Sequence, residues 1–321
     1  MSQQSVIDGP ASSPARTATI TGGDRIPTPT VSVVVPAHDE AGTLRRSLRA
    51  LADAAVREVP EVVVVANGCT DDTAEVARAA GVVVVELAEA SKAAALRAGD
   101  AVATAFPRIY LDADIVLTPG TLDALAQRLR EGDLLASSPR VRFDTSSSSW
   151  PVRAFYAVYA ELPYVRDGLV GLGVYGLSRE GRARFAEFPD LTSDDLFVQR
   201  SFAEHERGSS DGTFVVAAPR DLRNLLKVRV RTAAGNAQLS AVAVPVTAEA
   251  RGTGPAGVGP VAGGDRFERS TATTSSAMLR LAVRRPRLIP SLVVYTAITV
   301  ASRVLARTGQ GSAWQRDSST R

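Results

Sequence analysis

Two aspartates one residue apart, Asp112 and Asp114, follow the apolar segment Ile109-Tyr110-Leu111 and are well placed to do chemistry. In an extended segment alternate side chains point the same way, so both carboxylates face one side. Such a pair can hold Mg²⁺ or Mn²⁺ through oxygen, and the bound ion keeps open positions for diphosphate oxygens. The same pattern arises by chance in acidic loops, so its meaning depends on the elements that position it.

Strand and helix patterns alternate along the chain up to these aspartates. Val31-Ser32-Val33-Val34-Val35 is a short β-branched run closed by Pro36, which is typical of a buried parallel strand. Leu44, Leu48 and Leu51 then recur at helical spacing. Similar patterns predict further strands over 61–66, 82–85 and 109–111, and helices over 71–80 and 91–103. This order predicts an α/β fold with a Rossmann-like, mainly parallel sheet and helices on both faces.

Polar side chains stand at the end of each predicted strand. His38-Asp39-Glu40 follow the first strand, and Asn67, Glu86 and Asp112 follow the next three. In open sheets of this kind, ligands bind beyond the carboxyl ends of the strands. We therefore expect the chemistry of this chain to gather along that edge.

Four segments together resemble the motifs of the family 2 glycosyltransferases, which have the GT-A fold. Residues 33–40 (Val-Val-Val-Pro-Ala-His-Asp-Glu) resemble the family's Pro-Ala-x-Asn-Glu motif, and residues 67–73 (Asn-Gly-Cys-Thr-Asp-Asp-Thr) its Asp-Gly-Ser-x-Asp-x-Thr turn. Residues 91–99 (Ser-Lys-Ala-Ala-Ala-Leu-Arg-Ala-Gly) resemble its Gly-Lys-x-x-Ala-x-Asn-x-Gly helix, and residues 112–114 its Asp-x-Asp motif. The likeness extends over about residues 31–230, with the four motifs in the family's order.

The resemblance implies a site for a nucleotide-diphospho-sugar donor. Pro36, Glu40 and Asn67 would line the nucleoside pocket. Asn67 replaces the family's usual carboxylate, and its amide can donate and accept hydrogen bonds to a base, but it equally fits an Asn-Gly turn. Lys92, near the start of a helix, would pair with the diphosphate unless it is a solvated surface lysine.

The resemblance also implies a metal and a base. Asp114 and Asp112 would bind Mn²⁺ or Mg²⁺, and Asp112 would serve the ribose as well. Thr192-Ser193-Asp194-Asp195-Leu196 resembles the family's Glu-Asp motif, in which the second acid takes the acceptor's proton. That position makes Asp195 the catalytic base and Asp194 its structural partner, although two acids also suit the start of a helix.

Two further groups of residues are weaker candidates. The acceptor site of the family lies before the base, at a distance that matches Gly171, Gly173 and Tyr175. After the base, an alternating basic strip loosely resembles a motif of processive members, but without its aromatic residue: Lys227, Arg229 and Arg231. We therefore expect addition of a single sugar, with the strip either contacting the diphosphate or facing solvent.

Composition excludes other classes of protein. The chain is 45% hydrophobic and 22% charged, which suits a sizeable core, and its net charge of +3 is too small to favour nucleic acid as the main partner. With Cys69 as its one cysteine and only His38 and His205 as imidazoles, no internal disulfide and no zinc-type cluster are expected. Residues 1–27 lack the apolar core of a signal peptide, so we expect a cytoplasmic protein.

The chain is expected to divide into five segments: a disordered N-terminal segment (1–27), a GT-A domain (28–230), a linker or loosely packed segment (231–264), a C-terminal helical region (265–308) and a disordered tail (309–321). Within the helical region, residues 288–302 carry no charge, contain Pro290 and have arginines on both sides. Three interpretations stay open for them: a helix packed on the domain, a helix at a membrane surface, or a membrane span, for which the run is short.

The sequence as a whole predicts an inverting, metal-dependent glycosyltransferase. It would move a sugar to a glycan or lipid-linked acceptor, in envelope or exopolysaccharide synthesis, in the cytoplasm or at the inner face of the cell membrane. Two alternatives remain: a catalytically silent nucleotide-sugar-binding protein of the same fold, and a sugar nucleotidyltransferase. The last would carry a Gly-rich phosphate loop where this chain has residues 36–40. The sugar, the base, the acceptor and the oligomeric state are not identified.

Overall fold

The computed structural model describes residues 28–166, 172–190, 194–241 and 264–307. Strand and helix alternate through the first part of the chain, as the sequence predicts. The elements there are β1 (Val31–Ala37), α1 (Ala41–Ala54), β2 (Pro60–Asn67), α2 (Thr73–Ala79), β3 (Val83–Leu87), α3 (Lys92–Val102) and β4 (Arg108–Leu111). Apolar periodicity therefore located these strands and helices to within a few residues.

The elements that follow are more varied in length and order. They are β5 (Val116–Leu117), α4 (Thr121–Arg130), β6 (Ala136–Asp144), α5 (Trp150–Tyr159), α6 (Pro163–Arg166), β7 (Val174–Leu177), α7 (Arg179–Arg182), α8 (Asp194–Ser201), β8 (Arg207–Ala217), α9 (Leu222–Ala241), α10 (Gly264–Arg284) and α11 (Ile289–Arg307). Two 3-10 helices, η1 (Glu204–Glu206) and η3 (Pro286–Leu288), lie before β8 and α11.

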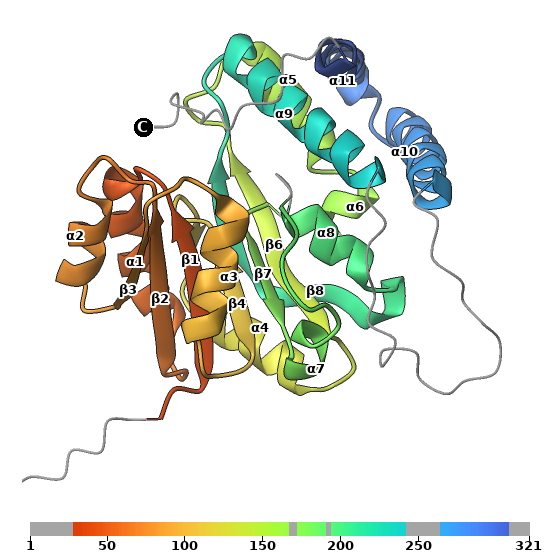
Figure 1. The fold of residues 1–321 in the computed structure, drawn as a ribbon. Helices are drawn as coiled ribbons and strands as arrows, with labels where there is room; N and C mark the ends of the chain where they lie inside the picture. The colour runs from red at the N-terminus through yellow and green to blue at the C-terminus, as the bar shows by residue number, and fades with distance from the viewer. Residues whose placement is uncertain (1–27, 167–171, 191–193, 242–263, 308–321) are drawn as a thin grey trace, which may run out of the picture.

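Eight strands form one sheet in the order β3-β2-β1-β4-β7-β6-β8-β5. Strand β1 pairs in parallel with β2 and β4, and β2 pairs in parallel with β3. Strand β7 runs antiparallel to β4 and β6, and β5 antiparallel to β8, whereas β6 and β8 are parallel. The sheet is therefore mixed, with a parallel Rossmann-like half and helices on both faces (Figure 1).

Strand β1 is buried on both faces, which explains its run of valines. Val33 and Val35 pack in a cluster with Leu44 of α1. Val34 points the opposite way, into the cluster that contains Leu96 of α3. Because successive side chains of a strand point to opposite faces, this one strand anchors the helices of both layers. It thereby fixes where the loop after β1 begins.

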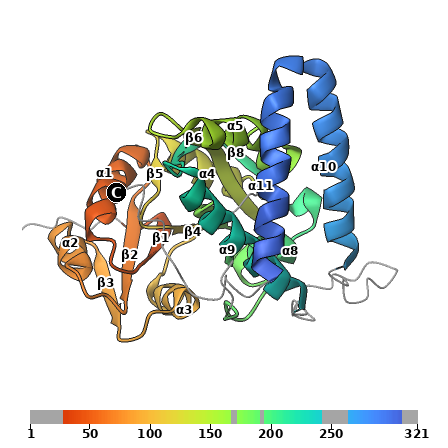
Figure 2. The same ribbon diagram turned by 90° about the horizontal axis from the view of Figure 1, so that it is seen from above.

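A third apolar cluster joins α5, α9 and α11, which lie together in Figures 1 and 2. Phe155 of α5 stacks on Tyr295 of α11, with ring centroids 5.0 Å apart. Leu225 of α9 and Ile298 of α11 are buried in the same cluster. Helix α11 thus packs on the domain along one side. Among the described helices, residues 286–307 are also long and apolar enough to cross a membrane, by length and composition only.

Helix α9 departs from the expected division of the chain. Residues 231–241 continue this helix rather than starting the linker expected from 231 to 264. The single Gly235 in this part costs a helix only about 1 kcal/mol relative to alanine, and the alanines beside it favour helix. The rest of that segment up to residue 263, and the terminal segments expected to be disordered, lie outside the described residues.

Candidate active site

The loop that carries Asp112 is held in place by the loop before β7. The Asp112 backbone N–H donates to the Gly173 carbonyl oxygen at 2.7 Å. Gly173 has φ 97°, and a Cβ there would lie 2.8 Å from Cγ1 of Ile115 and 3.1 Å from Oδ2 of Asp112. Only glycine therefore fits this close approach. Gly171, the other glycine predicted for an acceptor site, lies outside the described residues.

Lys92 joins the two acidic motifs. Its Nζ lies 2.8 Å from Oδ1 of Asp112 and 2.8 Å from Oδ1 of Asp194. Ser91 caps helix α3 by accepting from the Ala94 backbone N–H, which places Lys92 at the first turn. The side chain of Lys92 is only 23% exposed, so it is not a solvated surface lysine. The C-terminal end of β4 and the N-terminal end of α8 thus meet at Lys92.

The two acids of α8 have different surroundings. Asp194 is buried, and its Oδ2 accepts a hydrogen bond from the Tyr175 hydroxyl at 3.0 Å. Tyr175 is itself buried in β7 and stacks on Tyr110, with ring centroids 5.0 Å apart. Asp195 is only partly buried. Asp194 is therefore the fixed member of the pair and Asp195 the accessible one.

Tyr175 corrects one prediction from the sequence. It was a candidate for the acceptor site, but its ring is buried and its hydroxyl is bound to Asp194. A buried ring cannot contact an acceptor that arrives from solvent. Its place in the structure is under Asp194, where it holds that carboxylate against Lys92.

Burial and mutual repulsion change the acidity of the cluster. Burial raises the pKa of Asp112 to about 6, with Asp194 and Asp114 adding to the rise and Lys92 opposing it. Burial and Asp194 raise the pKa of Asp195 to about 8. Burial alone would lower the pKa of Lys92, but Asp112 and Asp194 hold it above its ordinary value. The site therefore holds more negative charge than its own lysine balances.

The charge of Asp114 is influenced by a further acid, Glu40, and by a further cation, Arg231. Desolvation of the carboxylate raises its pKa most, Glu40 adds to the rise, and Lys92 and Arg231 lower it. Arg231 stands on α9, so this helix places one of its cations within electrostatic reach of the edge formed by β1 and β4. Glu40 precedes α1, and its backbone N–H donates to the Thr73 hydroxyl at 2.7 Å.

The three basic residues of α9 do not form one strip. In a helix, residues four apart share a face, whereas residues two apart point to different sides. Arg229 lies over the rings of Phe155 and Tyr159, with 5.4 and 5.2 Å between guanidinium carbon and ring centroids. Lys227 is exposed, and Arg231 is the member that acts on Asp114. The alternating pattern in the sequence was therefore misleading.

The structure corrects a second prediction, which was that the amide of Asn67 contacts the base of the nucleotide. The side chain is 1% exposed. Its Nδ2 donates to the Ala37 carbonyl at 2.7 Å, and its Oδ1 accepts from the Ser91 backbone N–H at 3.0 Å. Asn67 thus ties together the ends of β1 and β2 and the start of α3, and Pro36 is likewise buried within β1. Both shape the edge from beneath.

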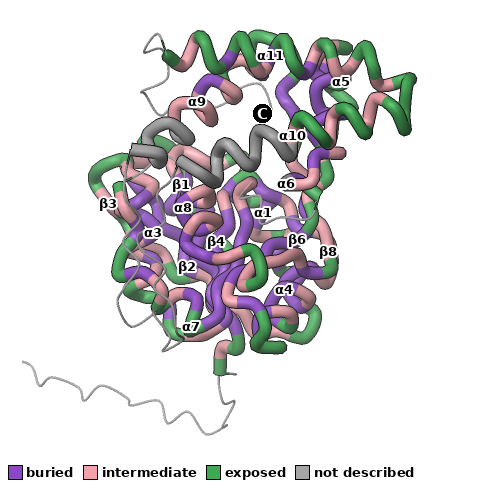
Figure 3. Tube along the Cα trace, turned by 90° about the vertical axis from the view of Figure 1, so that its right-hand side faces the viewer, coloured by how far each residue is buried: buried purple, intermediate pink, exposed green. Residues whose placement is uncertain are grey.

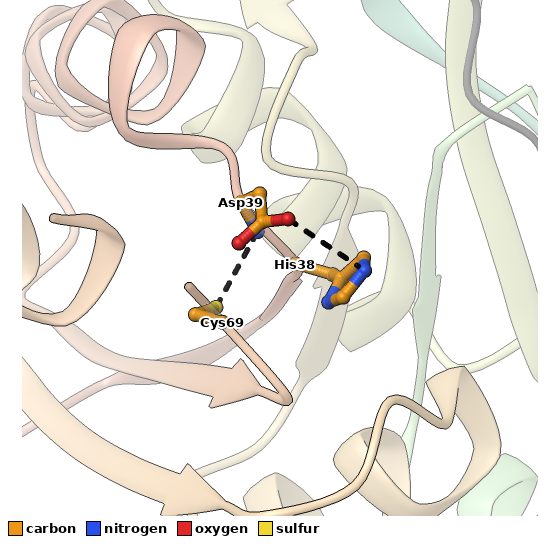
Figure 4. A group of neighbouring side chains, drawn as sticks. All are labelled: His38, Asp39 and Cys69. Atoms are coloured by element: carbon orange, nitrogen blue, oxygen red, sulfur yellow. Dashed lines mark hydrogen bonds and ion pairs between the residues drawn. The ribbon is translucent and has the colours of Figure 1, made fainter. Parts of the chain in front are cut away.

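His38, Asp39 and Cys69 come together on the loops after β1 and β2 (Figure 4). Their donor atoms lie within 4.8 Å of one another, a cluster that was not expected from so few histidines. His38 Nδ1 lies 2.7 Å from the Asn67 carbonyl, and Asp39 accepts from the Thr70 backbone N–H at 2.5 Å. Burial raises the pKa of the Cys69 thiol, which keeps it neutral and disfavours metal binding. These contacts join the two loops.

Comparison with known proteins agrees with this geometry. Residues 32–186 match the family model described as glycosyl transferase family 2. No curated protein matches the chain. The structure is similar to the mannosyltransferase PcManGT from Pyrobaculum calidifontis, solved with GDP-Man and Mn²⁺, at 22% identity over 89% of each chain and a TM-score of 0.59. This likeness shows a shared GT-A fold.

Two mycobacterial structures are more distant. Glucosyl-3-phosphoglycerate synthase from Mycobacterium tuberculosis is 20% identical over 58% of this chain and 70% of its own, with a TM-score of 0.44. A structure described as a mycobacterial protein is 22% identical over 68% of this chain and 76% of its own, with a TM-score of 0.48.

Proposed function

Because residues 32–186 form a glycosyltransferase domain of family 2, we propose that this enzyme transfers a sugar with inversion from a nucleotide diphosphate to an acceptor hydroxyl. The observation that carries the proposal is the position of Lys92 between Asp112 and Asp194. It places the acids suited to a donor metal beside the acids suited to a base. A single sugar bound at this edge can then face both groups.

The donor side consists of Asp112, Asp114 and the cations around them. Their raised pKa values reflect partly desolvated carboxylates crowded with other acids, whose negative charge a divalent cation would balance, so these carboxylates fit Mn²⁺ or Mg²⁺. When bound, the ion neutralises the charge that develops on the leaving diphosphate. Lys92 at the start of α3 and Arg231 of α9 supply positive charge for the same diphosphate. Asp112 also serves the ribose.

The nucleoside is proposed to lie against the ends of β1 and β2. Glu40 is proposed to line this pocket, because its carboxylate acts electrostatically on Asp114 and so lies near the proposed metal ligands. Pro36 and Asn67 contribute by shaping the pocket floor, because both side chains are buried.

Asp195 is the proposed base. It takes the proton of the acceptor hydroxyl as that oxygen attacks the anomeric carbon, from the face opposite the leaving diphosphate. Its raised pKa makes it a stronger base than an ordinary aspartate. Asp194 remains bound to Lys92 and Tyr175 and holds the first turn of α8 in position. Gly173 contributes to the site because, without a side chain, it lets the loop before β7 lie close to Asp112.

We further propose that the acceptor is a glycan or lipid-linked carbohydrate, in envelope or exopolysaccharide synthesis at the cytoplasmic side of the membrane. Support comes from the apolar, arginine-flanked helix α11, which packs near α9 and its Arg231. The family's aromatic motif for processive synthesis has no counterpart after the base. One sugar is therefore added per acceptor.

The test is a thermal-shift panel of GDP-, UDP-, dTDP- and CDP-sugars with and without Mn²⁺. GDP-mannose comes first, since PcManGT was solved with it. A ligand at 100 times its Kd stabilises the folded state by about 2.7 kcal/mol, so the matching donor raises Tm only when metal is present. A shift without any later transfer would indicate the silent binding protein. No shift with any donor would refute the proposal.

A further inference from the structure

Helices α10 and α11 present an apolar surface that faces away from the domain. Along the outer side of α11, exposed residues recur every three or four positions, and Figure 3 shows them alternating with less exposed stretches. Val283 is 77% exposed, Leu279 68% and Val293 65%. We call the exposed residues of α10 and α11 the hairpin face. Its apolar members are Leu279, Val283, Ile289, Val293, Val300 and Val304.

The hairpin face is also strongly basic. Residues 274–307 contain six arginines and no acid, whereas the whole chain has a net charge of only +3, so the remainder carries −3. All six are exposed: Arg280, Arg284, Arg285, Arg287, Arg303 and Arg307. Arg285 pairs with Glu161 of the domain at 2.8 Å. Positive charge is therefore concentrated around the exposed apolar side chains, whereas the remainder of the chain has a net negative charge.

The inner side of α11 fixes how this face is presented. Tyr295, Ile298 and Ser302 are buried against α5 and α9, with Tyr295 stacked on Phe155. The helix cannot leave the domain without exposing that cluster. The turn between α10 and α11 projects beyond the rest of the described chain (Figure 2). The face is thus held as part of the surface of a folded protein.

We propose that the hairpin face docks on the surface of an anionic lipid membrane. Valine, leucine and isoleucine side chains insert between lipid headgroups, and arginines around them pair with lipid phosphates. A second copy of this chain would bring two sets of arginines together, which like-charge repulsion opposes. Helix α11 stands at the end of the molecule where β1 and β4 finish (Figure 1), so docking brings the catalytic edge toward the membrane.

Vesicle flotation of the full chain tests this without any sugar donor, so its outcome is separate from that of the transfer assay. We expect binding to vesicles with about 30% phosphatidylglycerol in phosphatidylcholine, and little binding to phosphatidylcholine alone. Raising the salt from about 0.1 to 0.5 M should release most of the protein, because screening shortens the reach of the arginines.

Two sets of variants identify the surface. Replacing Arg280, Arg284 and Arg287 together by glutamine should weaken binding about a hundredfold. The same change at the exposed residues Arg45, Arg46 and Arg49 of α1 removes equal charge and should have a much smaller effect. Val283→Ser should weaken binding several-fold, whereas Val56→Ser, at a site 73% exposed on the domain, should not. Circular dichroism verifies that each variant folds.

Several results would overturn the proposal. Equal binding to neutral and anionic vesicles would remove the role of charge. An effect of the α1 variant as large as that of the hairpin variant would show that only net charge matters. If Val283→Ser altered the oligomeric state in light scattering but left flotation unchanged, the face would be an interface between copies. Protein that resists release at high salt and alkaline carbonate would be a membrane span instead.

Discussion

Removing one hydroxyl, by Tyr175→Phe, tests whether Asp194 is held for the sake of its neighbour. The Tyr175 hydroxyl donates to Asp194 at 3.0 Å, while its ring stays stacked on Tyr110 in the variant. A hydrogen bond to a charged group contributes about 1.5–3 kcal/mol, so the free energy of unfolding should fall by that amount. For a domain of this size, Tm should fall by about 3–12 °C.

The activity of the same variant carries the stronger prediction. Lys92 still pairs with Asp112, so donor affinity should stay within about twofold, which is about 0.4 kcal/mol. Loosening of Asp194 displaces Asp195, so kcat should fall about tenfold. Urea unfolding, thermal shift with donor and steady-state transfer measure the three quantities.

Tyr110→Phe is a matched control. The Tyr110 hydroxyl donates to Asp100 at 2.7 Å, is equally buried and belongs to the same pair of stacked rings. This variant should lose similar stability but keep its kcat. If both variants lowered kcat equally, or if Tyr175→Phe changed nothing, Asp194 would not be a positioning residue.

Three further variants probe the same edge. Lys92→Met leaves Asp112 and Asp194 without their shared cation, so donor affinity in calorimetry should fall at least about tenfold, and an unchanged Kd would contradict its role. Gly173→Ala should lower stability by about 1–3 kcal/mol and weaken metal binding, because its Cβ would meet Ile115 and Asp112; wild-type Tm and metal affinity would refute this. Asp195→Asn should stabilise the metal-free protein increasingly from pH 4 to 8, as followed by Tm. The folded pKa of Asp195 is raised from 3.8 to about 8, so the parent loses stability as pH rises through that range; a constant Tm difference would contradict this raised pKa.

The parallel half of the sheet was predictable because its signals are local. The valines of β1 and the spaced leucines of α1 report burial within a few residues of chain, and polar residues mark where the strands end. Asp112 and Lys92 were found in the same way, since each adjoins the end of a strand or the start of a helix. The expectation that chemistry gathers on one edge follows from topology alone.

What the sequence could not provide depends on distant contacts. The pairing of Lys92 with Asp194, and the burial of Tyr175 beneath it, arise because β7 inserts beside β4. Asn67 looks like a binding residue until the Ser91 backbone is found on its amide. Helix α9 was not predicted, because the sequence from residue 231 onward shows no clear apolar period.

The spacing of the basic residues was also misleading, because residues two apart share a face on a strand but not on a helix. Lys227, Arg229 and Arg231 alternate in sequence, which suggests one strip, but on α9 Arg229 points away from the face that Lys227 and Arg231 share. Only the three-dimensional structure shows that Arg231 belongs with Asp114 and Arg229 with an aromatic cluster.

The most direct test compares Asp195→Asn with Asp114→Ala in donor binding and sugar transfer. We expect Asp195→Asn to bind the metal-dependent donor like the parent but to transfer sugar about 10²–10⁴ times more slowly, because only the base is lost. Asp114→Ala should lose both binding and transfer, since it removes a proposed metal ligand. Transfer by Asp195→Asn at the parent rate would contradict the assignment of the base and, with it, the proposed mechanism.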